Sequence, residues 1–225
     1  MHARKIQRLS VREGYDLWSD TYDDTPNPVV RMDARHTVAL LRPQAGEHIL
    51  DAGCGTGRNF EPVVRAGSRL TGVDFSHGML ATAKHRYPVV PLALADLQQP
   101  LPFAAETFDA VLCALIGEHL TQLRAVFENF YVLLKPSGRL LFSVYHPAMA
   151  EAGKEAHFEH DGVEYRLGAE RHGIEDYRRP MNAAGFALIQ RHEFKGDAQL
   201  AAEVPSKAQR LLDFPVLLIF EARKS

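Results

Sequence analysis

Cysteine, tryptophan and long hydrophobic runs are all scarce in this 225-residue chain. Its two cysteines, Cys54 and Cys113, cannot build the disulfide framework of a small secreted domain, so we expect free thiols and a cytoplasmic protein. No apolar run approaches the roughly 18 residues that a membrane-spanning helix needs, and the polar first residues do not resemble a signal peptide. The sequence therefore predicts no membrane partner.

An excess of one charge is missing as well. The chain has 26 Lys and Arg against 28 Asp and Glu, a formal net charge of -2. Proteins that bind nucleic acid carry clustered positive charge, so we expect no nucleic-acid partner. With 46% hydrophobic residues the chain can bury one sizeable core, which predicts a single domain over residues 1–225. A small molecule is the expected partner, and the sequence does not decide whether the chain forms a homodimer.

A glycine-rich turn follows a short apolar run that begins at Ile49. Its sequence is Asp51-Ala52-Gly53-Cys54-Gly55-Thr56-Gly57. Glycines at alternate positions let the backbone turn sharply and approach a ligand closely. A dinucleotide-binding fingerprint has its third glycine one place later, where this chain has Arg58, and this disfavours a nicotinamide-dependent oxidoreductase. A structural turn without a ligand is the alternative interpretation.

Two acidic residues follow the next two predicted strands. A strand over residues 69–73 ends at Asp74, where a carboxylate can accept hydrogen bonds from ribose hydroxyls. The alternative for Asp74 is a helix cap, although Ser76 already provides an N-cap for a helix over residues 77–86. A strand over residues 89–94 contains Pro91, which favours a sheet edge, and leads to Asp96. A solvated loop aspartate is the alternative there.

The remaining pattern alternates strands and helices. The apolar run at residues 108–115 is typical of a parallel strand buried on both faces. An amphipathic helix is expected over residues 120–134, a break at 135–138 and a strand at 139–145. A further helix at 174–184 and strands at 186–193 and 216–222 complete an α/β pattern.

The ordered set of the glycine turn, Asp74, Asp96 and Ser137-Gly138 resembles the class I S-adenosylmethionine (SAM)-dependent methyltransferases, of the small-molecule type found in ubiquinone and menaquinone biosynthesis. The resemblance covers about residues 15–223. It implies a Rossmann-like, doubly wound seven-stranded sheet of order 3-2-1-4-5-7-6 with strand 7 antiparallel. The family usually has glycine where this chain has Ser137, a departure that affects only a turn.

The same resemblance implies SAM as cofactor and methyl transfer to a small-molecule acceptor. Asp96 would accept a hydrogen bond from the exocyclic amine of adenine, and the backbone amide of Leu97 would donate one to an adenine ring nitrogen. The SAM-site residues that it implies are Asp51, Gly53, Cys54, Gly55, Gly57, Asp74, Phe75, Met79, Asp96 and Leu97. A noncatalytic SAM-binding or scaffolding protein of the same fold is the alternative, because fold alone does not establish activity.

The predicted chain has four parts: an N-terminal helical lid at 1–45, a SAM-binding core at 46–147, a substrate-side insertion at 148–173, and a C-terminal helix with the last two strands at 174–225. Two residues outside the glycine turn are candidates for catalysis. Tyr22 lies in a Tyr-Asp element that resembles the lid of the family, and an aromatic contact holding the first helix on the core is its alternative.

The second candidate is His146, at the expected carboxyl end of a central strand, where an imidazole can accept a proton near neutral pH. A turn histidine bonded to backbone is its alternative. Glu118 and His119 are weaker candidates. The spacing of His157, His160 and His172 suggests metal ligands, but the glycines around them indicate a loop or hairpin, so we expect no metal.

Overall fold

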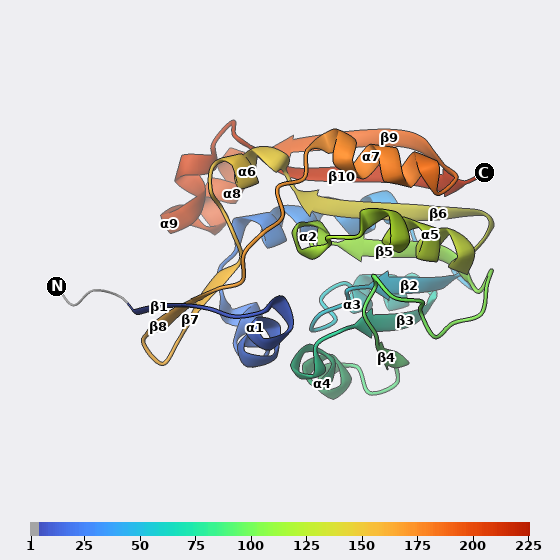
Figure 1. Cartoon of the computed structure of the whole chain (residues 1–225), viewed down its shortest axis with the longest axis horizontal. Coiled ribbons are helices and arrows are strands. Elements are labelled where there is room, and N and C mark those ends of the chain that lie inside the picture. The colour runs from blue at the N-terminus through green and yellow to red at the C-terminus, as the bar shows by residue number, and fades with distance from the viewer. Residues whose placement is uncertain (1–4) are drawn as a thin grey trace.

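The computed structural model describes residues 5–225, apart from the side chains of residues 206 and 208. Its centre is a seven-stranded sheet of order β4-β3-β2-β5-β6-β10-β9. β10 pairs antiparallel with both β6 and β9, whereas the other pairs are parallel. The strands are β2 (His48–Ala52), β3 (Arg69–Asp74), β4 (Leu92–Leu94), β5 (Phe108–Ala114), β6 (Leu134–Tyr145), β9 (Phe186–Lys195) and β10 (Pro215–Lys224). The predicted order and the antiparallel seventh strand are confirmed (Figure 1).

Helices cover both faces of this sheet, because its central strands are apolar on both sides. Along β5, Val111 and Cys113 contribute to one buried cluster, and Leu112 and Ala114 contribute to the other. The first cluster includes residues of α5 (Leu123–Leu133) and α7 (Ile174–Ala183). The second includes residues of α2 (Pro28–Leu41), α3 (Phe60–Arg65), α4 (His77–Arg86) and α8 (Ala198–Glu203). This is the doubly wound arrangement that the alternating pattern predicts.

Three local predictions differ from the structure. The strand expected at residues 89–94 is shortened to β4, at the sheet edge that Pro91 favours. The helix expected at 120–134 is preceded by the short 3-10 helix η2 (Gly117–His119), and α5 begins only at Leu123. Residues 135–138, where a break was expected, are part of β6. The strand is irregular there: Ser137 adopts a left-handed φ of 61°, and the register with β5 shifts.

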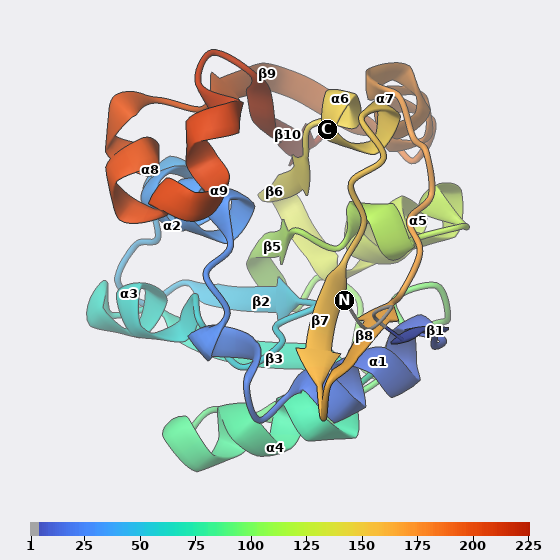
Figure 2. The ribbon, with the colours of Figure 1, turned by 90° about the vertical axis from the view of Figure 1, so that its left-hand side faces the viewer.

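A second, three-stranded sheet lies beyond the carboxyl ends of the parallel strands (Figures 1 and 2). The insertion forms the antiparallel hairpin β7 (His157–His160) and β8 (Val163–Arg166), which turns at Asp161 and Gly162, both with positive φ. The N-terminal strand β1 (Lys5–Arg8) pairs in parallel with β8. The hairpin confirms the interpretation of the histidine-rich segment, whereas its pairing with the N-terminus was not predicted.

The N-terminal elements pack against this small sheet through aromatic rings. α1 (Val11–Trp18) and the 3-10 helix η1 (Tyr22–Asp24) precede α2. The Trp18 ring stacks on Phe158 of β7, with ring centroids 4.8 Å apart. The remaining short elements are α6 (Pro147–Glu151), α9 (Pro205–Ala208) and η3 (Gln209–Leu211). The N-terminal segment and the insertion thus form one layer above the edge where the parallel strands end.

Candidate functional site

A cavity lies at the carboxyl edge of the sheet, where β2 separates β3 from β5. The chain leaves β2 toward α3 on one face and leaves β5 toward α5 on the other, so this edge is the topological switch point at which open α/β sheets bind ligands. The cavity encloses about 820 Å³ of space, part of it open to solvent. We call it the glycine-turn cavity, because Gly53, Cys54 and Gly55 line it.

The glycines of the turn are needed for different structural reasons. Gly53, Gly55 and Gly57 all have positive φ, at 77°, 52° and 81°. A Cβ on Gly55 would meet only the Met79 sulfur, 4.0 Å away, so the missing side chain leaves room for a ligand. A Cβ on Gly57 would come within 2.9 Å of the Phe60 ring, and Gly57 does not line the cavity. The last glycine therefore permits close packing.

Asp74 ties the turn to the end of β3. Its carboxylate accepts hydrogen bonds from the Gly55 amide at 2.8 Å and the Ser76 amide at 2.9 Å, one on each oxygen. Asp74 lines the cavity, and burial raises the pKa of its carboxyl although these amides lower it. Each oxygen keeps a further lone pair for a ligand. The Ser76 hydroxyl caps α4 by accepting from the Met79 amide, so Asp74 is not the cap of that helix.

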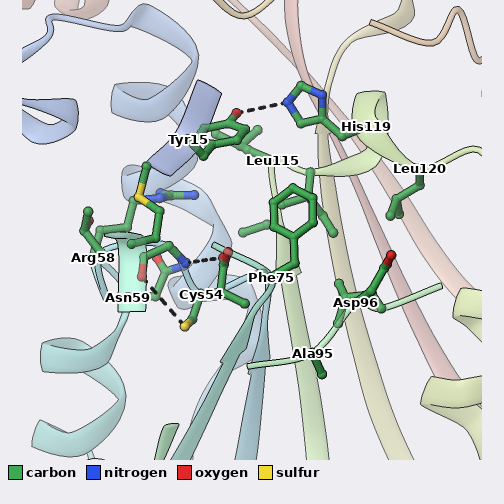
Figure 3. Close-up of a pocket in the computed structure, with 18 of the residues that line it drawn as sticks. Tyr15, Cys54, Arg58, Asn59, Phe75, Ala95, Asp96, Leu115, His119 and Leu120 are labelled. Atoms are coloured by element: carbon green, nitrogen blue, oxygen red, sulfur yellow. Dashed lines mark hydrogen bonds between the residues drawn. The ribbon is translucent and has the colours of Figure 1, made fainter. Parts of the chain in front are cut away.

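Asp96 and Leu97 line the cavity together with Phe75 and Met79. One Asp96 oxygen accepts from the Gln98 amide at 3.0 Å. Figure 3 shows Asp96 and Arg58 on opposite sides of the view, with Phe75 between them. Of the ten SAM-site residues predicted, the structure brings eight to this cavity and leaves Asp51 and Gly57 outside its lining.

Asp51 is fully buried in β2, directly before the turn, and near the charged groups of Arg58 and Asp33. Burial raises the pKa of its carboxyl to about 7, against the opposing effect of the Arg58 guanidinium. Arg58 forms an ion pair with the fully buried Asp33 of α2, with Nη2 and Oδ2 2.6 Å apart. Asp33 also accepts a hydrogen bond from the Ser143 hydroxyl of β6 at 2.5 Å. These contacts join the glycine turn to α2.

The N-terminal segment provides two tyrosines to the cavity wall. The Tyr15 hydroxyl lies 2.9 Å from Nε2 of His119, and both residues line the cavity (Figure 3). Burial lowers the pKa of His119 to about 4, so the imidazole is neutral near neutral pH. Burial also raises the pKa of Tyr22 to about 12, so its phenol keeps its proton. Tyr22 lines the cavity and also packs edge-on against Trp18, with ring centroids 4.9 Å apart, and its catalytic role stays a prediction.

His146 lies elsewhere. It is the N-cap of α6, where its Nδ1 accepts from the Ala148 amide at 3.2 Å, and its Nε2 lies 3.3 Å from Oε2 of Glu193. It is not among the residues that line the glycine-turn cavity. This geometry is that of the turn histidine left open by the sequence, because the β6 segment ends by turning into α6. The catalytic role of His146 stays a prediction that this arrangement does not support.

The other histidine candidates make ordinary contacts. His157 Nδ1 lies 2.9 Å from the Glu155 carbonyl, and His172 Nε2 lies 2.7 Å from the Leu120 carbonyl. Within residues 5–225 no group of three or more His, Cys, Asp or Glu side chains is arranged to hold a metal ion. In the same part of the chain, no helix is long and apolar enough to cross a membrane.

Several residues that line the cavity are not among the predicted site residues, and Tyr15, Arg58 and Asn59 are three polar ones. In the sequence, Arg58 argues against a dinucleotide-binding fingerprint. Its position directly after the third glycine also indicates that it lies beside the turn. Tyr15 belongs to the Tyr-Asp element, but nothing in its local pattern indicated His119, 104 residues away, as its partner. His119 was considered only as a weaker candidate than His146.

Comparisons with known proteins show relatives of this chain. Residues 50–142 match the family model described as a methyltransferase domain. The demethylmenaquinone methyltransferase of Streptomyces avermitilis is 33% identical over 141 residues, which are 62% of this chain and 59% of that protein. The ubiquinone biosynthesis O-methyltransferase of Coxiella burnetii is 29% identical over 143 residues, which cover 59% of this chain and 61% of that protein. The match thus spans less than two thirds of the length of these curated relatives.

Solved structures share the fold over most of the chain. An SAM-dependent methyltransferase from Mesorhizobium loti has a TM-score of 0.71 at 22% identity, covering 85% of this chain and 97% of that one. The [4+2]-cyclase SpnF has a TM-score of 0.69 at 19% identity and covers 98% of both chains. The matched methyltransferase domain over residues 50–142, the similarity to the curated relatives and the shared fold together support the resemblance of this chain to the class I SAM-dependent methyltransferases.

Proposed function

We propose that the protein transfers the methyl group of SAM to a small-molecule acceptor. The single observation that carries this proposal is the convergence of Gly55, Asp74 and Asp96 on one cavity at the switch point of the sheet. The relatives are named for demethylmenaquinone and for ubiquinone biosynthesis, which supports a small molecule as the acceptor.

The residues of the cavity fit SAM. The open side of Gly55 gives room for the amino-acid chain to pass close to the backbone. The buried Asp74 carboxylate would accept from the ribose hydroxyls, and Asp96 with the Leu97 amide would bind the adenine edge. The amino-acid end would then lie toward Arg58 and Tyr22.

SAM supplies an activated methyl group, which an acceptor atom takes by in-line displacement: the bond from sulfur to methyl breaks as the new bond forms. The chain itself has to align the acceptor and to exclude water, and such positioning can contribute about 7–11 kcal/mol. A proton lost by the acceptor atom would pass to the Tyr15–His119 pair, because both side chains face the cavity and His119 is neutral.

A noncatalytic SAM-binding role is the second candidate. The structure named as a [4+2]-cyclase has the same fold, so this fold does not by itself establish methyl transfer.

One experiment separates the two functions. The protein is incubated with radiolabelled SAM and a small-molecule extract, and transfer of label to any metabolite is measured. We expect labelled product and S-adenosylhomocysteine (SAH) in equal amounts. Tight SAM binding with no labelled product from any extract would favour the noncatalytic role.

A further inference from the structure

A buried ion pair joins α2 to the wall of the glycine-turn cavity. Nη2 of Arg58 lies 2.6 Å from Oδ2 of Asp33. Arg58 lines the cavity (Figure 3) and keeps 18% of its side chain exposed, whereas Asp33 is fully buried and is not among the lining residues. The arginine can therefore contact a ligand directly, and the aspartate can act on that ligand only through the arginine.

Asp33 is held in one orientation by two elements. Its Oδ1 accepts hydrogen bonds from the Thr37 hydroxyl, one turn further along α2, and from the Ser143 hydroxyl of β6, both at 2.5 Å. Both hydroxyl residues are fully buried. Because these two bonds fix the carboxylate, Oδ2 presents an acceptor to Arg58 at a fixed place.

Arg58 keeps a donor that the protein does not use. Its Nη1 is buried and has no hydrogen-bond partner within the described part of the chain. The donors of a guanidinium lie in one rigid plane, so the contact of Nη2 with Asp33 limits the directions in which Nη1 can donate. A buried donor without a partner is costly, which indicates that a ligand supplies the acceptor. A carboxylate is the strongest match, because its hydrogen bonds to a guanidinium are charge-assisted.

SAM has one carboxylate, at the end of its amino-acid chain. We propose that Asp33 is a positioning residue of the SAM site: it directs Arg58 so that Nη1 binds the carboxylate of SAM. Asp74 and Asp96 bind the nucleoside end separately, so the Arg58 contact sets the preference for a donor molecule that carries this carboxylate. This inference rests on the proposed function, and it assigns α2, in the predicted lid segment at 1–45, a role in cofactor binding.

The test compares two ligands that differ only in this group, SAM and decarboxylated SAM. Their dissociation constants for the intact protein are measured by isothermal titration. We expect the wild type to bind SAM about tenfold or more tightly than decarboxylated SAM. Arg58→Gln should remove this preference and should still bind decarboxylated SAM, because the nucleoside contacts remain.

Asp33→Asn separates positioning from charge. Loss of an anion near the site would by itself favour a carboxylate ligand and raise the preference for SAM. Loss of positioning lowers this preference, and we expect a decrease of about threefold or more. In an Arg58→Gln background, the same change should leave the preference unaltered, because Asp33 acts through Arg58. A preference that stays at the wild-type level or rises in folded Asp33→Asn would overturn the proposal.

Because breaking a buried ion pair is destabilising, a second variant keeps both charges. Thr37→Val combined with Ser143→Ala removes the hydroxyls that orient Asp33, and it should also lower the preference for SAM. The matched control is Asp109→Asn, since Asp109 forms an ion pair with Lys135 at 2.8 Å and neither residue lines the cavity. This control should keep the wild-type preference.

The wild-type titrations distinguish this inference from the proposed function. Equal binding of SAM and decarboxylated SAM would overturn the carboxylate contact and leave the SAM site in place. Absence of binding of both ligands would contradict the proposed function itself, and this inference with it. A wild-type preference in the folded variant that lacks both hydroxyls would overturn the positioning role of Asp33.

Discussion

The hydroxyl of Tyr15 lies 2.9 Å from Nε2 of His119, and this contact joins the N-terminal helix to the segment that follows β5. Both residues face the glycine-turn cavity. Asp16, the next residue, binds the Ser76 hydroxyl at 2.6 Å and the Gly78 amide at 3.0 Å. The first helix is therefore fastened to two loops of the cavity at once, which places its tyrosine beside the proposed methyl-transfer site.

The Tyr15–His119 pair predicts a loss of turnover without a loss of SAM affinity. His119→Asn should lower kcat by about 10²-fold, the lower end of the range for general acid–base catalysis, because a group with a pKa of about 4 is a weak base. His146→Asn is the matched comparison, and we expect it to keep most of its turnover. The reverse ranking in folded variants would return the catalytic role to His146.

The same pair predicts the pH profile. Burial keeps His119 neutral down to about pH 4, so activity should show no acid limb near pH 6.5, the ordinary value for histidine. The rate is measured from pH 5 to pH 8 at saturating SAM. A half-maximal rate near pH 6.5 that disappears in His146→Asn would contradict the assignment.

Asp74→Asn should weaken SAM binding by about 1.5–3 kcal/mol, the range for a hydrogen bond to a charged group. Asparagine keeps the shape of the side chain and one acceptor oxygen, so it leaves one of the Gly55 and Ser76 amides unpaired, whereas alanine would leave both unpaired. Titration calorimetry gives the affinity, and circular dichroism checks the fold. Wild-type affinity in a folded variant would mean that the carboxylate does not reach the ribose.

Two glycines of the turn should respond differently to alanine. Gly55→Ala places a methyl group in the cavity and should reduce SAM affinity more than it reduces stability. Gly57→Ala would press on Phe60 and Tyr87 and should lower the melting temperature more than it affects binding of SAM to the folded fraction. Calorimetric titration and thermal unfolding are run on both variants. If the two lose affinity and stability in the same proportion, the distinction between them is wrong.

The buried carboxyl of Glu118 should make the stability of the folded protein depend on pH. Burial raises the pKa of its carboxyl from 4.5 to about 8, so between these values the folded protein holds a proton that the unfolded chain releases. The contribution of Glu118 to stability therefore decreases as pH rises from about 4.5 to 8. Glu118→Gln removes this dependence and keeps His119, so the melting temperature of the variant relative to wild type should rise between pH 5 and pH 8. A shift of about 2–4 °C is expected for each kcal/mol. A difference that stays constant with pH would contradict the buried, protonated carboxyl.

The sequence alone predicts those parts of the fold and the site that depend on neighbouring residues in the chain. The alternate glycines, the apolar run of β5 and the acids at the ends of strands all follow from short-range pattern, and the strand order follows from the family resemblance. The contacts that depend on distant segments were out of reach. The pairing of β1 with β8 joins residues that are more than 150 positions apart, and the short strand β1 has no pattern that indicates its partner. The position of His146 at the N-cap of α6, where its ring lies near Ala148 and Glu193, could not be predicted from the sequence, because the turn into α6 is set by tertiary packing.

The most direct test of the central claim is isothermal titration of the wild-type protein with SAM and with SAH. If the glycine-turn cavity is an SAM site, both ligands should bind saturably at one site per chain, and Asp74→Asn should weaken both. NAD should give no saturable heat, because Arg58 stands where a dinucleotide-binding turn needs glycine. No binding of SAM or SAH at millimolar concentration, or binding of NAD in their place, would contradict the account.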